Sequence, residues 1–309
     1  MKKKSGFEKF HKQAKTGRVL KEQIRQEKKL VTKERKEFFE KKRQEQYGVL
    51  KKLQEPVPAE KKIPRIISAT EMPLNKYLAH SGVCSRRDAA EIVKSGKVQV
   101  NGTLVTEPGF KVTGKDDVKV AGKKVQPTKD LFYILLNKPK DYITTTDDPQ
   151  GRKTVLDLIQ HATKERVYPV GRLDRNTSGV LLFTNDGDLS QKLTHPSNGI
   201  KKVYAVTLDR PLEKADFESI MAGVQLEDGF AKVDALGFTD EGDRRQVGVE
   251  LHSGKNRVVR RIFEAMKYDV RNLDRVVFAG LTKKNVPRGK WRFLTEKEVR
   301  DLKHFSKGK

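Results

Sequence analysis

The sequence predicts an α+β protein in three parts: an N-terminal basic tail, a small domain with two helices and a hairpin, and a larger domain. In the larger domain we expect a mixed, mainly antiparallel sheet with packed helices. Residues 1–62 carry 21 Lys and Arg against nine Glu, a short helical periodicity then leads into an Asn-Gly turn, and many short apolar runs follow. We place the three parts at residues 1–71, 72–126 and 130–305.

The whole chain is strongly basic. Its 309 residues include 66 Lys and Arg and 41 Asp and Glu, so the formal net charge is +25. Because residues 1–62 account for +12 of this charge, +13 remains for the rest of the chain. A field of this sign concentrates polyanions near the protein, which favours a nucleic acid as partner over an anionic membrane surface.

Membrane insertion and secretion do not fit the sequence. No apolar run approaches the ~20 residues that span a bilayer, and the lysine-rich N-terminus lacks the apolar segment of a signal peptide. We therefore expect a cytoplasmic protein that does not bind membranes. Separately, we expect it to be a monomer.

The basic tail has the composition of a weak helix. Residues between Leu20 and Gln46 are mostly good helix formers, but the apolar positions are too sparse to form a continuous stripe. We expect a fluctuating helix or disorder, which either solubilises the chain or contacts phosphates. Pro56, Pro58 and Pro64 indicate a linker, since each disfavours helix at the preceding residue.

Sequence patterns for metals and nucleotide cofactors are missing. The six histidines form no HExxH spacing, and neither a Walker-type GxxxxGK[ST] nor a GxGxxG after a strand occurs. The single cysteine, Cys84, excludes an intramolecular disulfide and a cysteine-based metal cluster, and suits a reducing compartment. We expect neither a metal nor a cofactor.

Two short helices are predicted in the small domain. Pro73 can open the first, which stops near Gly82. Ser85 and Asp88 have the spacing of a capping box for the second, which ends at Gly96. The apolar positions at helical spacing are Leu74, Tyr77, Leu78, Ala89, Ile92 and Val93.

A hairpin and a set of basic residues complete this domain. Val98 and Val100 alternate into Asn101-Gly102, the usual sequence of a tight turn. The neighbouring Lys and Arg side chains are either ordinary solvated charges or contacts to a polyanion.

The segment MPLNKYLAHSGVCSRRDAAEIVKSGKVQVNG resembles the small RNA-binding module named after ribosomal protein S-four. The resemblance covers about residues 72–120, because the order helix, SRR, helix, GKVxVNG is matched throughout. It implies that an RNA-facing surface contains or adjoins Ser85, Arg86, Arg87 and Lys97. Arginine and lysine contacts of this kind position a protein on phosphates without reading sequence.

The larger domain has six apolar runs with the composition of strands, separated by turn residues. We expect helices from Thr154, where Thr154 and Asp157 have capping-box spacing, and after Asp188. This mixture predicts helices packed on a mainly antiparallel sheet. The predicted strands are residues 131–136, 180–183, 203–208, 231–236, 246–251 and 276–278.

A helix beginning near Asn256 should have two distinct faces. Its buried positions at i, i+3, i+4 and i+7 are Val259, Ile262, Phe263 and Met266. A basic set at i, i+3 and i+4 consists of Arg257, Arg260 and Arg261. Three neighbouring guanidinium groups require a partner, which either a buried carboxylate or RNA phosphates could supply.

The segment YPVGRLDRNTSGVLLFTNDG places one carboxylate, Asp174, between Gly171 and Gly179 and just before an apolar run. The glycines allow the backbone to turn or to approach a ligand closely. From these residues alone, Asp174 is either a reactive group held in a fixed loop or an aspartate that caps a turn.

Three separated motifs over residues 130–294 resemble those of the RNA pseudouridine synthases of the RsuA/RluB group. They are LNKPKDYITTTDDPQGRKTVLDL, GRLDRNTSGVLLFTNDGDL and GKNRVVRRIFEAMKYDVRNLDR, with KKVYAVTL between the last two. The resemblance implies that Asp174 is the catalytic acid, Tyr204 the active-site tyrosine and Arg260 the cation that compensates Asp174. Two residues depart from the family pattern: Asp141 stands where glycine is common, and Val258 where glutamine is common.

The resemblance implies an isomerase that converts a specific uridine of ribosomal RNA to pseudouridine without a cofactor. The RluB-like character of the match implies that this uridine lies in the large-subunit RNA. The partner would be ribosomal RNA or an assembling ribosomal subunit. A non-catalytic RNA-binding or ribosome-assembly factor is the alternative. Likewise, Tyr204 could be a core tyrosine, and Arg260 a surface phosphate contact. Further RNA contacts are expected at Lys138, Arg172, Arg175, Arg257 and Arg261.

Overall fold

The computed structural model describes residues 63–64, 71–128 and 130–304. The predictions for the basic tail at residues 1–62 lie outside the described residues. No helix in the described part of the chain has the length and apolar character needed to cross a membrane.

The small domain begins with the two predicted helices, α2 (Leu74–His80) and α3 (Arg86–Lys94). Both hydrogen bonds of the predicted capping box are present, because the Ser85 hydroxyl accepts from the Asp88 amide and the Asp88 carboxylate accepts from the Ser85 amide. The domain core contains five fully buried helical side chains, Leu74, Tyr77, Leu78, Ala89 and Val93.

The predicted hairpin is also present, formed by β3 (Val98–Val100) and β4 (Thr103–Leu104). Its turn residues have positive φ angles, 52° at Asn101 and 83° at Gly102, which asparagine and glycine tolerate best. The hairpin extends into a sheet of order β4-β3-β6-β7 with β6 (Val118–Val120) and β7 (Lys123–Val125). Separately, β2 (Met72–Pro73) pairs with β5 (Lys111–Val112).

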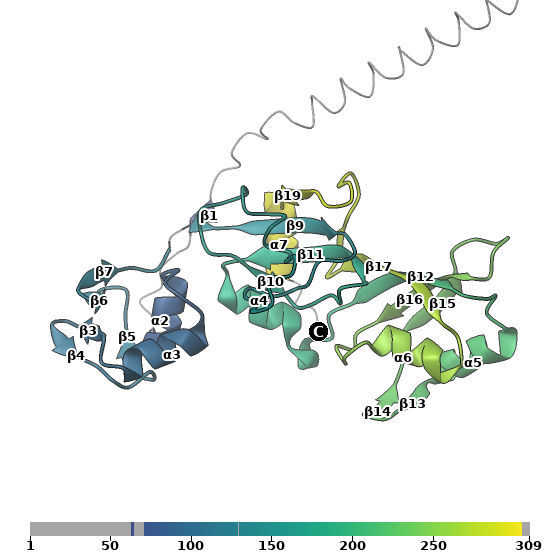
Figure 1. Cartoon of the computed structure of the whole chain (residues 1–309), viewed down its shortest axis with the longest axis horizontal. Helices are drawn as coiled ribbons and strands as arrows, with labels where there is room; N and C mark the ends of the chain where they lie inside the picture. The colour runs from purple at the N-terminus through teal and green to yellow at the C-terminus, as the bar shows by residue number, and fades with distance from the viewer. Residues whose placement is uncertain (1–62, 65–70, 129, 305–309) are drawn as a thin grey trace, which may run out of the picture. The chain divides into compact units, whose positions relative to one another are not determined.

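The larger domain is built on a nine-stranded sheet of order β15-β16-β12-β17-β11-β9-β19, with β10 paired to β11 and β18 paired to β17 (Figure 1). Only the β11–β17 pair is parallel, so the sheet is mixed and mainly antiparallel, as predicted. Its strands are β9 (Tyr133–Lys138), β10 (Tyr168–Val170), β11 (Ser178–Thr184), β12 (Lys202–Leu208), β15 (Ala235–Phe238), β16 (Gln246–Leu251), β17 (Val270–Phe278), β18 (Leu281–Thr282) and β19 (Trp291–Phe293). Two short pairs complete the domain: β1 (Ile63–Pro64) with β8 (Asp130–Leu131), and β13 (Val224–Leu226) with β14 (Gly229–Ala231).

Both faces of β9 and β11 are buried, which explains their uninterrupted apolar sequences. One face packs with α4 (Gly187–Thr194) and α7 (Glu296–His304), through Leu189, Leu193, Val299 and Leu302. The opposite face is covered by residues 155–167, through Val155, Ile159 and Val167. A short 3-10 helix, η1 (Pro196–Asn198), follows α4.

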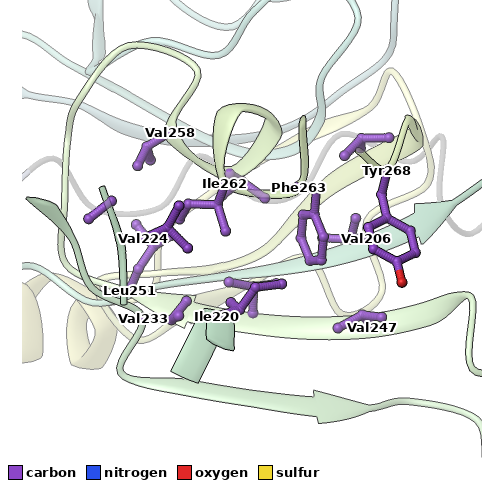
Figure 2. Packing of buried hydrophobic residues seen from close by; sticks show 14 of the residues in the cluster. Val206, Ile220, Val224, Val233, Val247, Leu251, Val258, Ile262, Phe263 and Tyr268 are labelled. Carbon is purple, nitrogen blue, oxygen red and sulfur yellow. The ribbon is translucent and has the colours of Figure 1, made fainter. Parts of the chain in front are cut away.

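The half of the sheet containing β12, β16 and β15 carries α5 (Lys214–Ala222) and α6 (Val258–Ala265) (Figure 1). Ile262 and Phe263 of α6 pack with Ile220 of α5 against apolar side chains of the sheet (Figure 2). Tyr268 lies at the edge of this cluster, and its hydroxyl donates to the Asp216 carboxylate. The predicted apolar face of α6 is confirmed, although Met266 at its end is only half-buried.

Three predicted elements of the larger domain are wrong. The apolar run 131–136 divides between β8, which pairs with β1, and β9, with Phe132 between the two strands. Residues 154–162 form successive turns and no α-helix, although the Thr154 amide donates to the Asp157 carboxylate as a cap would. Thr154 also bridges to Ile143, which holds the start of this segment in an extended conformation. The apolar run 231–236 divides between β14 and β15, because the chain leaves one sheet at Ala231 and enters another at Ala235.

Candidate active site

Asp174 lies in the loop that joins β10 to β11, and its side chain is half-buried. Hydrogen bonds to its main-chain carbonyl oxygens hold the loop in place. Each of the five carbonyl oxygens from Leu173 to Thr177 accepts at least one hydrogen bond. Buried carbonyl groups are costly when left unpaired, so this full set of partners fixes the backbone that carries the carboxylate.

Lys138 donates three of these hydrogen bonds. It is the last residue of β9, is 0% exposed, and its Nζ donates to the carbonyl oxygens of Asp174 at 3.0 Å, Arg175 at 3.3 Å and Thr177 at 2.8 Å. Burial lowers the pKa of Lys138 to about 8, although the nearby carboxylates of Asp174 and Asp141 act in the opposite direction. The ammonium group is therefore committed to the loop, and the prediction that Lys138 contacts RNA phosphate is wrong.

The side chains of Thr144 and Arg260 form further hydrogen bonds to the main chain of the loop. The Thr144 hydroxyl donates to the Leu173 carbonyl at 2.7 Å and accepts from the Leu173 amide at 3.3 Å. Nη2 of Arg260 donates to the Asn176 carbonyl at 3.2 Å, and Nη1 donates to the Val270 carbonyl at 2.8 Å.

Arg260 lies on α6 with 8% of its surface exposed, so the alternative that it is a surface phosphate contact is wrong. Burial and the neighbouring Arg257 lower its pKa, while the Asp174 carboxylate raises it. Asp174 and Arg260 therefore lie within electrostatic reach of each other. Nε of Arg260 is buried and has no hydrogen-bond partner among the described residues.

The other two arginines of the predicted basic set have carboxylate partners. Arg257 is exposed and pairs with Glu264 at 3.2 Å, while Arg261 forms a two-pronged pair with Asp228 of the β13–β14 turn. Arg257 precedes α6 with a φ of 48°. The guanidinium groups thus point to three different partners instead of forming one repulsive face.

Tyr204 lies in the middle of β12, opposite Arg275 of β17. The register of these strands shifts between Val203 and Tyr204, which leaves Val276 as an extra residue on β17. Burial lowers the pKa of Arg275. The interaction of its guanidinium with the Tyr204 phenol acts in the opposite direction.

Gly179 permits the close approach of β17 to β11. It has a φ of 113°, and a Cβ at this position would lie 2.1 Å from the carbonyl oxygen and 2.6 Å from the nitrogen of Arg275. No side chain larger than hydrogen fits there. The glycine after Asp174 therefore sets the distance between the loop and the strand that carries Arg275.

These elements surround a pocket of about 450 Å³, a size that suits a nucleotide-sized ligand. Asp174 and Tyr204 both line it, together with apolar side chains of Leu173, Val258, Leu273 and Phe278. The charged residues of the lining are one acid, Asp174, and six bases, Arg172, Arg175, Lys202, Lys255, Arg257 and Arg275. A pocket with this balance attracts an anionic ligand.

The structure brings some of the predicted RNA-binding residues to this pocket. Arg172, Arg175 and Arg257 are exposed along its lining, whereas Arg261 is half-buried outside it. In the small domain Arg86, Arg87 and Lys97 are exposed, and the hydroxyl of Ser85 is engaged in capping α3.

The two departures from the family pattern fit the structure. Asp141 has a φ of 68°, the conformation that glycine adopts readily, and its carboxylate faces Arg175 at 3.3 Å without lining the pocket of Asp174. Val258 is 7% exposed and contributes an apolar contact to the pocket.

Sequence reasoning missed Arg275 and Lys202 as residues of this pocket. Arg275 is 2% exposed, and Lys202 is half-buried with a pKa lowered to about 8, mainly by burial and also by Arg275. Lys202 begins β12 directly after another lysine, and β17 contains Arg271, Asn272 and Asp274 besides Arg275, so neither residue stands out in its strand sequence.

Comparison with known proteins identifies the family. Residues 132–265 match the family model described as RNA pseudouridylate synthase, and residues 72–118 match the S4 domain. The chain is 41% identical over 233 residues to ribosomal large subunit pseudouridine synthase B of Bacillus subtilis (strain 168), covering 74% of this chain and 95% of that relative. It is 36% identical over 231 residues to the dual-specificity RNA pseudouridine synthase RluF of Escherichia coli (strain K12), covering 74% of this chain and 77% of the relative.

A solved structure agrees with this relationship. The crystal structure of a pseudouridylate synthase matches with a TM-score of 0.55 and 25% sequence identity, covering 75% of this chain and 99% of that one. The expected fold class and the resemblance of the sequence motifs are both confirmed. The chain belongs to the RNA pseudouridylate synthase family and is an RNA pseudouridine synthase with an S4 domain.

Proposed function

We propose that this enzyme converts a specific uridine of large-subunit ribosomal RNA to pseudouridine, with Asp174 as its nucleophile. The observation that carries the proposal is the single carboxylate in a pocket lined by six basic residues. The printed name of the Bacillus subtilis relative, a ribosomal large subunit pseudouridine synthase, supports the choice of RNA.

The reaction detaches uracil from the anomeric carbon of ribose and rejoins it through carbon five, so its atoms and oxidation state are conserved. A carboxylate nucleophile divides this exchange into easier steps, by trapping the ribose at C1′ or by adding to the uracil ring. The fixed main chain of the Asp174 loop suits either route, because a nucleophile held in place avoids the entropic cost of orientation.

Tyr204 and Arg260 have separate roles in this proposal. The Tyr204 ring lines the pocket and offers a face on which the displaced uracil stacks, while its phenol relays the proton lost from carbon five. Arg260 offsets the cost of placing the Asp174 charge away from water, and it also holds the loop through the Asn176 carbonyl.

The target nucleotide has to leave its base stack to enter the pocket, which costs a few kcal/mol and is easier in loops or distorted helices. In this proposal the flanking phosphates contact Arg172, Arg175 and Arg257, which are exposed along the pocket lining. The small domain adds contacts from Arg86, Arg87 and Lys97. We propose that the protein works as a monomer in the cytoplasm, on ribosomal RNA or an assembling subunit.

The proposal is tested with large-subunit ribosomal RNA labelled with tritium at C5 of uridine. The parent protein should release tritium and form pseudouridine at one position. Asp174→Asn, which keeps the side-chain shape but removes the charge, should abolish release while binding RNA with similar affinity. Tritium release by Asp174→Asn at the parent rate would contradict the nucleophile assignment. No release by the parent protein would instead favour the alternative of a non-catalytic RNA-binding or ribosome-assembly factor.

A further inference from the structure

Two basic side chains of the pocket lining, Arg275 and Lys202, have no role in the mechanism described so far. Arg275 is 2% exposed, and its Nε donates to the Val180 carbonyl at 2.9 Å. Its guanidinium carbon lies 4.5 Å from the centre of the Phe278 ring. Nη2 is buried and, among the described residues, has no hydrogen-bond partner.

Lys202 is the second of these side chains. Its Nζ donates to the carbonyl oxygens of Ile200 at 3.0 Å and His252 at 2.8 Å. An ammonium group has three donors, so one remains after these two bonds. Lys202 and Arg275 are close enough for the charge of Arg275 to lower the pKa of Lys202.

No carboxylate within the described ranges forms an ion pair with either side chain. The acid next to Arg275 in the sequence, Asp274, is committed to Lys283 and Arg288. Removing a charge from water without a partner costs several kcal/mol. Two such charges in the lining of one pocket therefore indicate a ligand that carries negative charge next to them.

The proposed reaction creates such a charge. When the C1′–N1 bond breaks, its electron pair stays with uracil and spreads over N1, O2 and O4. Asp174 bonds to C1′ as N1 leaves. The ring then turns, C5 bonds to C1′ as the bond from C1′ to Asp174 breaks, the C5 proton passes to a base and N1 takes up a proton. The negative charge on the carbonyl oxygens thus exists only while the ring is detached or activated for departure.

We propose that Nη2 of Arg275 and Nζ of Lys202 donate hydrogen bonds to carbonyl oxygens of the displaced uracil and stabilise its negative charge. This inference rests on the proposed function. Arg275 also positions Tyr204 through its contact with the phenol, so the stacking surface and the charged donors are built as one unit on adjacent strands.

The geometry of the sheet holds these donors rigidly. The Nε–Val180 bond ties Arg275 to β11, the Phe278 ring packs on its guanidinium, and Gly179 lets β17 approach the Asp174 loop. Donors fixed before the reaction stabilise a developing charge without reorganisation, and removal of one typically costs ~10²–10³ in rate.

The test uses the full chain and large-subunit ribosomal RNA transcribed with either uridine or 5-fluorouridine. Fluorine at C5 makes the departing ring a more stable anion, which then needs less help from the protein. First-turnover rates with excess enzyme are measured by mass spectrometry of the C5-linked nucleosides, and RNA affinity is measured separately. The fluorinated product has no C5 proton to lose, so it keeps its fluorine and takes up water across the N1=C6 bond. Arg275→Gln and Lys202→Met are compared with Arg271→Gln and Lys201→Met, exposed neighbours of the same types.

We expect Arg275→Gln to slow conversion of uridine by about 10²-fold or more and Lys202→Met to slow it by about tenfold or more, with RNA affinity changed by less than about threefold. The loss should be clearly smaller with 5-fluorouridine, whereas both neighbour variants keep the parent rate. Arg275→Lys, which keeps the charge, should recover part of the loss. If Arg275→Gln does not fold, Lys202→Met carries the same comparison.

Equal losses with uridine and 5-fluorouridine would overturn the inference, because a purely structural role affects both substrates alike. A loss explained entirely by weaker RNA binding would also overturn it. If the parent protein itself forms no pseudouridine in this RNA, the proposed function fails first and the inference falls with it.

Discussion

The ammonium group of Lys138 donates to the main-chain oxygen of Asp174 at 3.0 Å, so a buried cation holds the backbone of this residue while its carboxylate stays directed to the pocket. The same group reaches the Arg175 and Thr177 carbonyls. Strand β9 thus fixes the loop that precedes β11, although the two segments are 36 residues apart in the sequence.

Replacement of this lysine should loosen the loop. In Lys138→Met the carbonyls of Asp174 and Arg175 keep other donors, the amides of Thr177 and Asp141, but the carbonyls of Thr177 and Pro139 lose the lysine donor. An unsatisfied buried carbonyl costs ~1–3 kcal/mol of stability. Because the variant also removes the buried ammonium group, its lower desolvation cost offsets part of this loss. We expect a net destabilisation of ~1–2 kcal/mol in urea unfolding and at least a tenfold lower rate of pseudouridine formation.

Lys140→Met provides the matched control, because Lys140 is exposed two residues away. It should change unfolding by less than ~0.5 kcal/mol and leave the rate unchanged. If Lys138→Met also kept the parent rate, the hydrogen bonds of Lys138 would not be what positions Asp174.

Gly179 should tolerate no side chain. In Gly179→Ala the new Cβ would lie 2.1 Å from the Arg275 carbonyl, in a backbone conformation with a φ of 113°. Overpacking typically costs ~1–3 kcal/mol and strained backbone ~1–3 kcal/mol more, so we expect ~3 kcal/mol or more of destabilisation. Gly237→Ala, on a strand of the same sheet, has no atom within 4 Å of its Cβ, and its thermal unfolding should match the parent. Similar melting temperatures for the two variants would contradict this account.

Local patterns in the sequence predicted the local structure well. The Ser85–Asp88 capping box, the Asn101-Gly102 turn and the apolar face of α6 each depend on residues a few positions apart. The Thr154–Asp157 pair shows the limit of this reasoning, since its capping bond forms without a helix behind it. Pairing of Thr154 with Ile143 outweighs the local preference there.

The candidate site could be predicted only where a motif marked it. Asp174 and Tyr204 both line the pocket, but the burial of Lys138 and the place of Arg275 depend on strand order. Arg275 lines the pocket because β17 pairs in parallel with β11 and has a bulge opposite Tyr204. Neither the pairing nor the bulge leaves a periodic signal in the sequence.

The small domain should contribute to RNA affinity mainly through charge. Arg86 and Arg87 are exposed at the start of α3, and each phosphate contact adds about 0.7–0.9 to the slope of log affinity against log salt. In Arg86→Ser/Arg87→Ser we expect weaker binding to ribosomal RNA and a slope lower by about 1.4–1.8, as measured by filter binding at several salt concentrations. A control pair, Lys297→Ser/Arg300→Ser, changes exposed residues of α7. An equal drop in slope for both pairs would show that only overall charge matters.

Stability should rise with pH above 8 because of the buried lysines. Burial lowers the pKa of Lys202 from 10.5 to about 8, so between pH 8 and 10 the unfolded chain binds a proton that the folded chain has lost. The free energy of unfolding then increases with pH, by at most ~1.4 kcal/mol per pH unit for one lysine, and this increment disappears as the pH falls through 8. Lys202→Met should therefore have a shallower rise than the parent in urea unfolding at pH 8.0, 8.7 and 9.4. Lys201→Met, which removes an exposed neighbour, should keep the parent slope, and identical slopes for all three proteins would mean that Lys202 titrates normally.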